Sequence, residues 1–156
     1  FYTRGMSFID MAYLKKSDLK NGTITYRRRK TGQQLSVKWE KCMEDIIAKY
    51  RENTATRYLL PIITNPCSDE RTQYRNAICR INVALKEVVG LAGLNIPLTM
   101  HVARHCWASV AKSKNIPLSV ISEGMGHDSE ETTRIYLASL DTSVVDKANR
   151  LILKDF

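Results

Sequence analysis

Hydrophobic residues recur along most of the chain at the spacing of helices, which predicts a mainly helical protein. One helix is indicated by Trp39, Met43, Ile46, Ile47 and Tyr50, and a second by Ile78, Ile81, Leu85 and Val88. The second helix is expected to begin near Ser68-Asp69-Glu70, because these side chains can accept hydrogen bonds from the first free backbone amides. A loop is expected after it, at Gly90 and Gly93.

Residues 19–39 have a different pattern. Two stretches rich in β-branched and aromatic residues, 23–26 and 35–39, flank Lys30-Thr31-Gly32-Gln33, which has the composition of a hairpin turn. Asn21-Gly22 is a second turn signal, since both residues tolerate a left-handed backbone. We therefore predict an antiparallel sheet of two or three strands, preceded by a short helix over residues 7–14.

Shorter apolar periods follow in the last third of the chain. They predict helices near residues 99–112, 117–124 and 129–138, and a last amphipathic helix through Val144, Val145, Ala148 and Leu151. The expected fold is mainly α with a small antiparallel β-sheet, in the α+β class. A length of 156 residues suits one domain with a core. Because the chain starts without Met and directly in structured sequence, we expect residues 1–156 to be one domain of a longer protein.

The net charge of the chain indicates which kind of molecule it binds. Lys and Arg number 24 against 16 Asp and Glu, which gives a net charge of +8 and a pI of about 9.4. Such an excess suits a polyanion, because each phosphate that Lys or Arg neutralises releases condensed counterions. No apolar run is long enough to span a membrane.

The four cysteines, Cys42, Cys67, Cys79 and Cys106, form no C-x-x-C pair. We therefore expect neither a zinc site nor a disulfide framework. Reduced and mostly buried thiols in a cytoplasmic protein are expected instead.

Residues 99–110 carry the first set of candidate functional side chains. On a helix, an apolar face would hold Val102, Ala103, Cys106, Trp107 and Val110. The opposite face would hold His101, Arg104, His105 and Ala108. His101 and Arg104 are three residues apart, so they are neighbours on the helix surface. An isolated H-x-x-R pair is most often only a solvated polar face.

A second set lies downstream. Gly126 can end one helix, His127 follows in the connection, and Ser129-Glu130-Glu131 can open the next helix. Tyr136 then lies two turns into that helix. A single tyrosine is more often a half-buried core residue. The joint spacing of H-x-x-R-H, G-H and Tyr is what indicates a functional site.

This combined pattern resembles the tyrosine recombinase, or phage integrase, family, whose catalytic domain carries H-x-x-R-H, then L-G-H, then a nucleophilic tyrosine. The likeness extends over nearly the whole chain. It implies the fold of that catalytic domain, with Tyr136 as the nucleophile. It further implies that His101 and Arg104 form the second-box pair and that His127 is the later histidine.

The implied reaction breaks and rejoins DNA through a 3′-phosphotyrosyl bond, with no cofactor and no metal. Arginine suits this reaction because its planar fork can bind two phosphate oxygens at once, and a histidine can assist loss of the phenolic proton. Lys30 matches the lysine that the family carries on a hairpin, where it can protonate the leaving 5′ oxygen. Its neighbours Arg27, Arg28 and Arg29 are alternatives.

The first box of this chain departs from the family. That box usually reads T-G-L-R-x-S-E-L-x-x-L, and Gly5 and Asp10 fix a register in which Ser7 stands at the arginine position. Serine supplies no charge, whereas Arg4 lies one turn earlier and can reach the same phosphate. We expect Arg4 to replace the missing arginine, with residues 27–29 or a neighbouring protomer as alternatives. Some integrases of mobile elements resemble this variant box.

The resemblance also implies double-stranded DNA as the partner, self-association into a tetramer on DNA, and an N-terminal DNA-binding part in the longer protein. It implies a place in the prokaryotic cytoplasm, on the nucleoid when DNA is bound, and no membrane or small-molecule partner. Two other classes stay open. A non-catalytic DNA-binding relative would not need His101, Arg104, His127 and Tyr136 together. A type IB topoisomerase typically has Lys or Arg where His101 stands.

Overall fold

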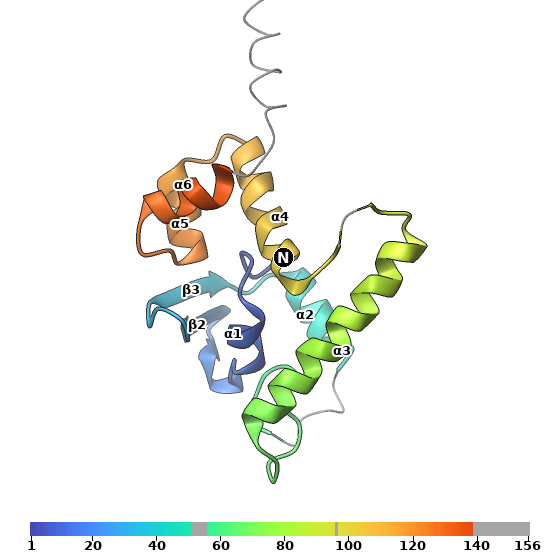
Figure 1. Cartoon of the computed structure of the whole chain (residues 1–156). Helices are drawn as coiled ribbons and strands as arrows, with labels where there is room; N and C mark the ends of the chain where they lie inside the picture. Colours follow the sequence, from blue (N-terminus) through green and yellow to red (C-terminus); the bar gives the residue numbers. More distant parts are fainter. Residues whose placement is uncertain (51–55, 96, 139–156) are drawn as a thin grey trace, which may run out of the picture.

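The computed structural model describes residues 1–50, 56–95 and 97–138, and its elements confirm the expected fold class. Within these ranges the elements follow one another as shown in Figure 1: α1 (Phe8–Ala12), β1 (Leu19–Lys20), β2 (Thr23–Arg27), β3 (Gln34–Lys38), α2 (Lys41–Ala48), α3 (Glu70–Leu91), α4 (Met100–Ser113), α5 (Leu118–Met125) and α6 (Glu130–Ala138). The predicted helix through residues 144–151 lies outside the described residues.

The three strands form one antiparallel sheet in the order β1-β2-β3. Asn21 and Gly22 make the first turn with φ of 49° and 70°, as the sequence predicted. Ile24 pairs with Val37 across β2 and β3. Both are buried, and they form a core with Tyr26 of β2 and with Met6, Leu14 and Met43 from the flanking segments. One face of the sheet is therefore anchored to α1 and α2, which fixes the position of the hairpin between β2 and β3.

Helix α3 is attached to the rest of the fold mainly at its N-terminal end. Its N-cap is Asp69, as predicted, whose side chain accepts a hydrogen bond from the backbone N–H of Thr72. The aromatic rings of Phe8 and Tyr74 pack with centroids 5.7 Å apart, which joins α1 to α3. The C-terminal end of α3 extends away from the sheet (Figure 1).

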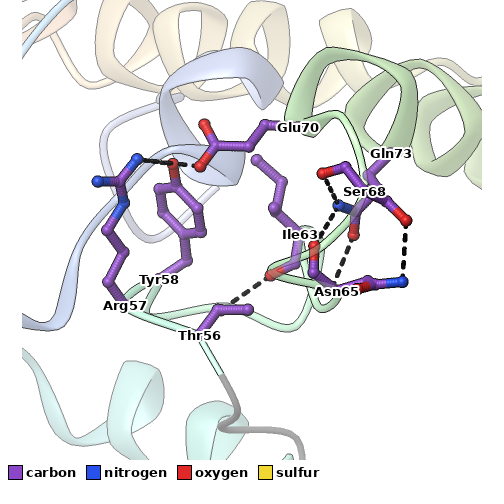
Figure 2. A network of polar contacts seen from close by, with 8 residues as sticks. All are labelled: Thr56, Arg57, Tyr58, Ile63, Asn65, Ser68, Glu70 and Gln73. Atoms are coloured by element: carbon purple, nitrogen blue, oxygen red, sulfur yellow. Dashed lines mark hydrogen bonds and ion pairs between the residues drawn. The ribbon is translucent and has the colours of Figure 1, made fainter.

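The loop before α3 is fixed by polar contacts, which Figure 2 shows. Arg57 Nη2 lies 2.9 Å from Glu70 Oε1 in the first turn of α3. Gln73 Oε1 accepts hydrogen bonds of 2.9 Å from the backbone amides of Thr64 and Asn65. The loop and the start of α3 are thus joined into one unit by these contacts.

Helices α4, α5 and α6 pack together beside the hairpin (Figure 1). Their shared core consists of Ala108, Ala111, Ile121, Met125 and Leu137. Small alanines on α4 let α5 approach closely, and Trp107 and Tyr136 pack at the edge of this core. The predicted limits of all three helices agree with the structure to within a few residues.

Two expectations about burial are wrong. The buried side of α4 is the one with Arg104, Ala108 and Ala111, while Cys106 and Val110 of the expected apolar face are exposed. The reason is that the N-terminal segment packs against Arg104 and α5 packs against the two alanines, all on this face.

The thiols were expected to be mostly buried, but three of the four cysteines are exposed and Cys42 is only half-buried. All four are free thiols. In the part of the chain that the structure describes, no helix has the length and apolarity to cross a membrane.

Gly5 joins the N-terminal segment to α4 and generates a stability prediction. A Cβ on Gly5, at φ +68°, would lie 3.0 Å from the Cα of Arg104, whereas a Cβ on Gly22, at φ +70°, meets nothing within 4 Å. We predict that Gly22→Ala costs about 1–2 kcal/mol of backbone strain. Gly5→Ala should cost the same plus roughly 1–3 kcal/mol, because the backbone of α4 must move away. Urea unfolding of both variants measures the difference, and equal losses would contradict this contact.

Candidate active site

Arg104 projects from α4 into the junction between the N-terminal segment and the end of α5. It is only 6% exposed. Its Nη1 donates to the carbonyl of Gly5 at 2.7 Å, and its Nη2 donates to the carbonyl of Met125 at 2.8 Å and lies 3.1 Å from His127 Nε2. These contacts fix the guanidinium at the floor of a cleft, with its direction set by backbone groups.

The end of α5 places His127. Gly126 adopts φ 64° in the left-handed region, which ends the helix as the sequence predicted. The backbone N–H groups of Gly126 and His127 donate to the carbonyls of Glu123 and Ser122, which is the Schellman pattern of a helix terminus. A Cβ on Gly126 would lie 2.7 Å from Arg28 Cδ, so any other residue here would displace the Arg28 side chain.

His127 is held in one tautomer by its two neighbours. Arg104 can only donate, so His127 Nε2 accepts, and the proton therefore sits on Nδ1 and is donated to Thr133 Oγ1 at 2.8 Å. Burial first, and then the charges of Arg104 and Arg28, lower the pKa of His127 to about 4. The ring is thus neutral at physiological pH.

Tyr136, on α6, lies among histidine rings from two other segments. Its ring stacks on His105 with centroids 4.0 Å apart and an interplanar angle of 4°. His101 and His127 stand edge-on to it, with centroids at 6.0 and 5.6 Å. Burial raises the pKa of Tyr136, and the charge of Arg104 opposes that rise. The phenol is therefore protonated at neutral pH and must lose its proton to act as a nucleophile.

The hairpin between β2 and β3 brings cations to the same place. Lys30 and Thr31 line the cleft from its turn. Arg28 also lines it, is 7% exposed, and donates from Nη1 to the carbonyl of Gly126. Arg27 instead donates to the carbonyl of Gly32 in an exposed position, and Arg29 stacks over the ring of Tyr13 at 3.8 Å.

The first box reaches the cleft through Ser7. Its hydroxyl lies 2.5 Å from Asp10 Oδ2, and its oxygen caps α1 by accepting from the backbone N–H of Asp10. The other oxygen of the buried Asp10 carboxylate accepts from the backbone N–H of Arg29 at 2.8 Å. Asp10 therefore ties α1 to the hairpin. Arg4 is exposed, with φ 56°, and is absent from the described residues that line the cleft.

Most of the catalytic residues predicted from the sequence line one cleft. Five of the six predicted catalytic residues line it: Lys30, His101, Arg104, His127 and Tyr136. Ser7 lines it as well, whereas Arg4 does not. These side chains come from α1, the hairpin, α4, the end of α5 and α6. Among the described residues, no three His, Cys, Asp or Glu side chains gather as metal ligands would.

Sequence reasoning gave no role to three residues that shape this cleft. His105 was assigned only to a helix face, although it is the residue that stacks on Tyr136. Thr133, fully buried, was not singled out, yet it fixes the tautomer of His127. Arg28 was only one of three alternatives. The sequence could have predicted that Arg28 is buried, because Ile24, Tyr26 and Arg28 follow the period-2 alternation of the buried strand face.

The chain is similar to known proteins in sequence and in fold. Residues 2–143 match the sequence profile of the phage integrase family. No curated protein sequence matches the chain. Among solved structures, the chain is similar to XerA recombinase, with a TM-score of 0.69 and 22% identity over 95% of this chain and 53% of that one.

Two DNA complexes are also similar in fold. XerH site-specific recombinase bound to a palindromic difH substrate, in a post-cleavage complex, gives a TM-score of 0.65 with 21% identity over 95% of this chain and 42% of that one. A lambda integrase dimer bound to a COC′ core site gives 0.56 with 18% identity, over 86% of this chain and 39% of that one. The chain thus spans about half the length of these proteins, or less.

The neutral state of His127 generates a pH prediction. In the unfolded chain a histidine has a pKa near 6.5, whereas in the fold His127 titrates at about 4. Between these values the unfolded state binds more protons, so stability should fall as the pH is lowered from 6.5 to 4. His127→Gln should weaken this slope and leave the part due to His105, whose pKa burial also lowers.

Titration of the histidine ring protons by NMR checks this assignment, because the chain holds only three histidines. The resonance that disappears in His127→Gln should be the one that titrates at about 4. A His127 resonance that titrates at 6.5 or above would contradict the buried, Arg104-bound ring.

Proposed function

Since the chain belongs to the phage integrase family, we propose that its cleft breaks and rejoins DNA strands through a covalent bond to Tyr136, as a site-specific recombinase. The main support for this proposal is that one cleft is lined by Tyr136, Arg104, His101, His127 and Lys30. A protein that only bound DNA would need cations on its surface, and would not need a tyrosine among histidine rings and a buried guanidinium.

In the proposed reaction, Tyr136 Oη attacks the phosphorus of a phosphodiester as the bond from phosphorus to the 5′ oxygen breaks. The phenolic proton leaves Tyr136, and the 5′ oxygen takes up a proton. The products are a 3′-phosphotyrosine and a free 5′-hydroxyl. Attack by the 5′-hydroxyl of another strand reverses each step, so the energy of the broken bond is kept in the intermediate.

Arg104 is suited to the charge that this reaction develops. The pentacoordinate transition state concentrates negative charge on the non-bridging oxygens, and a guanidinium can bind two oxygens at once. His101 is the histidine proposed to accept the phenolic proton. The Nε2 of His127 already accepts from Arg104, and the ring of His105 lies parallel to that of Tyr136. His101 meets the tyrosine ring edge-on from the cleft side.

Lys30 is proposed as the acid that protonates the leaving 5′ oxygen, because it lies at the tip of the hairpin on the rim of the cleft. Lys30→Ala should slow cleavage of ordinary DNA by roughly 10²–10⁴-fold. A substrate with sulfur at the 5′-bridging position needs no proton to leave, so the variant should cut it almost normally. Equal defects on both substrates would assign Lys30 to phosphate positioning instead.

DNA is the proposed partner, and the net charge of +8 supports it. Two of the structures similar in fold are recombinases in complex with their DNA sites. We further propose that the chain is the catalytic domain of a longer protein that has an N-terminal DNA-binding part. That protein would assemble as a tetramer on two duplexes, serve a mobile element, and act in the prokaryotic cytoplasm on the nucleoid.

The covalent bond gives the decisive test. The intact protein, incubated with a nicked suicide duplex that carries its recombination site, should form an adduct that survives SDS and disappears on proteolysis. Tyr136→Phe removes only the attacking oxygen, so the adduct should vanish while DNA affinity stays within a few-fold. Tyr26→Phe is the matched control, because Tyr26, on β2, is buried in the core of the sheet and does not line the cleft.

Peptide mapping of the wild-type adduct should identify Tyr136. An adduct that persists in Tyr136→Phe would refute the assignment of the nucleophile. Specific DNA binding without any adduct in the wild-type protein would favour the non-catalytic DNA-binding class.

A further inference from the structure

The cleft contains a second buried guanidinium that its first box does not supply. We propose that Arg28, on the hairpin, binds a non-bridging oxygen of the scissile phosphate together with Arg104, and so replaces the arginine that is missing at Ser7. This inference rests on the proposed function, because it assigns a role in the same reaction. It selects one residue among Arg4, Arg27, Arg28 and Arg29, which the sequence leaves open.

Strand alternation directs Arg28 inward. Along β2 the side chains of Ile24 and Tyr26 are buried while those of Thr25 and Arg27 are exposed. Arg28 comes one residue after the end of the strand and continues the buried face. Its backbone still pairs with the opposite side of the hairpin, since its N–H donates to the carbonyl of Gln33 at 2.9 Å. The backbone thus sets the direction of this side chain.

The end of α5 brings Arg28 next to Arg104. Arg104 donates to the carbonyl of Met125, and Arg28 donates to the carbonyl of Gly126, the next residue. Two guanidinium groups from distant segments therefore bind consecutive carbonyl groups. Their charges act on the same groups: after burial, the charge of Arg28 lowers the pKa of Arg104, and after burial and the charge of Arg104 it also lowers the pKa of His127.

Two cations held side by side in a buried position repel each other unless an anion lies between them. Neither Arg28 nor Arg104 forms an ion pair with a carboxylate in the part of the chain that the structure describes. The nearby buried carboxylate, Asp10, is engaged by the Ser7 hydroxyl and the backbone N–H of Arg29. A phosphodiester, with one negative charge shared by two oxygens, is the anion that this pair fits.

The Arg28 guanidinium also has N–H groups that can donate to a ligand. A guanidinium has five N–H groups. Among the described residues, the Arg104 guanidinium contacts three protein groups, whereas the Arg28 guanidinium contacts one, the carbonyl of Gly126, through Nη1. Arg28 can therefore keep its contact to Gly126 and still present a planar fork to a phosphate. The contact to α5 would then orient the fork before DNA arrives.

The other candidates are placed less well. Ser7 has its hydroxyl bound to Asp10, and Arg4 is exposed on a left-handed backbone outside the lining of the cleft. Arg27 is turned to the exposed side of the strand and Arg29 stacks on Tyr13. Of the four arginines that could supply the second clamp, only Arg28 lines the cleft.

The test compares two scissile groups in nicked suicide duplexes that carry the recombination site of the intact protein. One has the natural phosphodiester, and the other has a methylphosphonate, in which a neutral methyl group replaces one charged oxygen. Arg28→Ala should slow adduct formation on the phosphodiester by about 10²–10³-fold, the cost of losing one transition-state donor. On the methylphosphonate, which has less charge to neutralise, the defect should shrink at least tenfold. Arg27→Ala is the matched control and should cleave both substrates like the wild type.

A second variant guards against loss of folding, because Arg28 also holds the end of α5. Arg28→Lys keeps a cation and a donor for Gly126 but loses the planar fork. It should melt within a few degrees of the wild type and show a smaller defect that the methylphosphonate again reduces. If folded Arg28 variants are equally slow on both substrates, or if Arg4→Ala shows the defect and the rescue instead, the proposal is overturned. Absence of any adduct in the wild-type protein would refute the proposed function itself.

Discussion

The last turn of α5 leaves carbonyl groups that no further turn of helix can use, and the arrangement of the cleft depends on how these groups are satisfied. The Schellman pattern at Gly126 takes the carbonyls of Ser122 and Glu123. The carbonyls of Met125 and Gly126 are taken by guanidinium groups from α4 and from the hairpin. The same terminus therefore fixes His127 and both cations, and it carries the negative end of a helix dipole that favours them.

Without DNA, two groups of the cleft that can gain or lose a proton, Tyr136 and His127, are both uncharged. Burial keeps the Tyr136 phenol protonated and the His127 ring neutral. The buried charges of the cleft are then the two arginines, Arg28 and Arg104, which bind backbone carbonyl groups and, within the described residues, form no ion pair with a carboxylate. A bound phosphodiester would complete the charge balance at the point where Tyr136 must lose its proton. This links DNA binding to activation of the nucleophile without a small-molecule cofactor in the proposed scheme.

The first box, in which Ser7 replaces the arginine, has a structural role in this chain. Ser7 caps α1 and binds Asp10, and Asp10 in turn holds the backbone of the hairpin at Arg29. In this chain the first box supports the hairpin, and the hairpin carries the cation. On the proposed assignment the hairpin, and not the first box, supplies the second guanidinium, so the cleft keeps two guanidinium groups.

Much of the fold and of the site could be predicted from sequence because the signals are local. Capping residues and apolar spacing locate the helices, and Gly126 marks the end of α5. The tertiary partners could not be predicted. The buried face of α4 is set by Gly5 and α5, which favour small side chains over a broad apolar face. Three consecutive arginines have the same local chemistry, and only their alternation along the hairpin separates Arg28 from Arg27 and Arg29.

A crystal structure of the intact protein with DNA and vanadate is the most direct measurement of the central claim, since vanadate takes the trigonal bipyramidal shape of the transition state. Tyr136 Oη and the 5′ oxygen should occupy the two apical positions. Arg28 and Arg104 should each donate to an equatorial oxygen at about 2.7–2.9 Å. A structure in which Arg28 contacts only Gly126, while Arg4 or an arginine of a neighbouring protomer binds the vanadate, would contradict it.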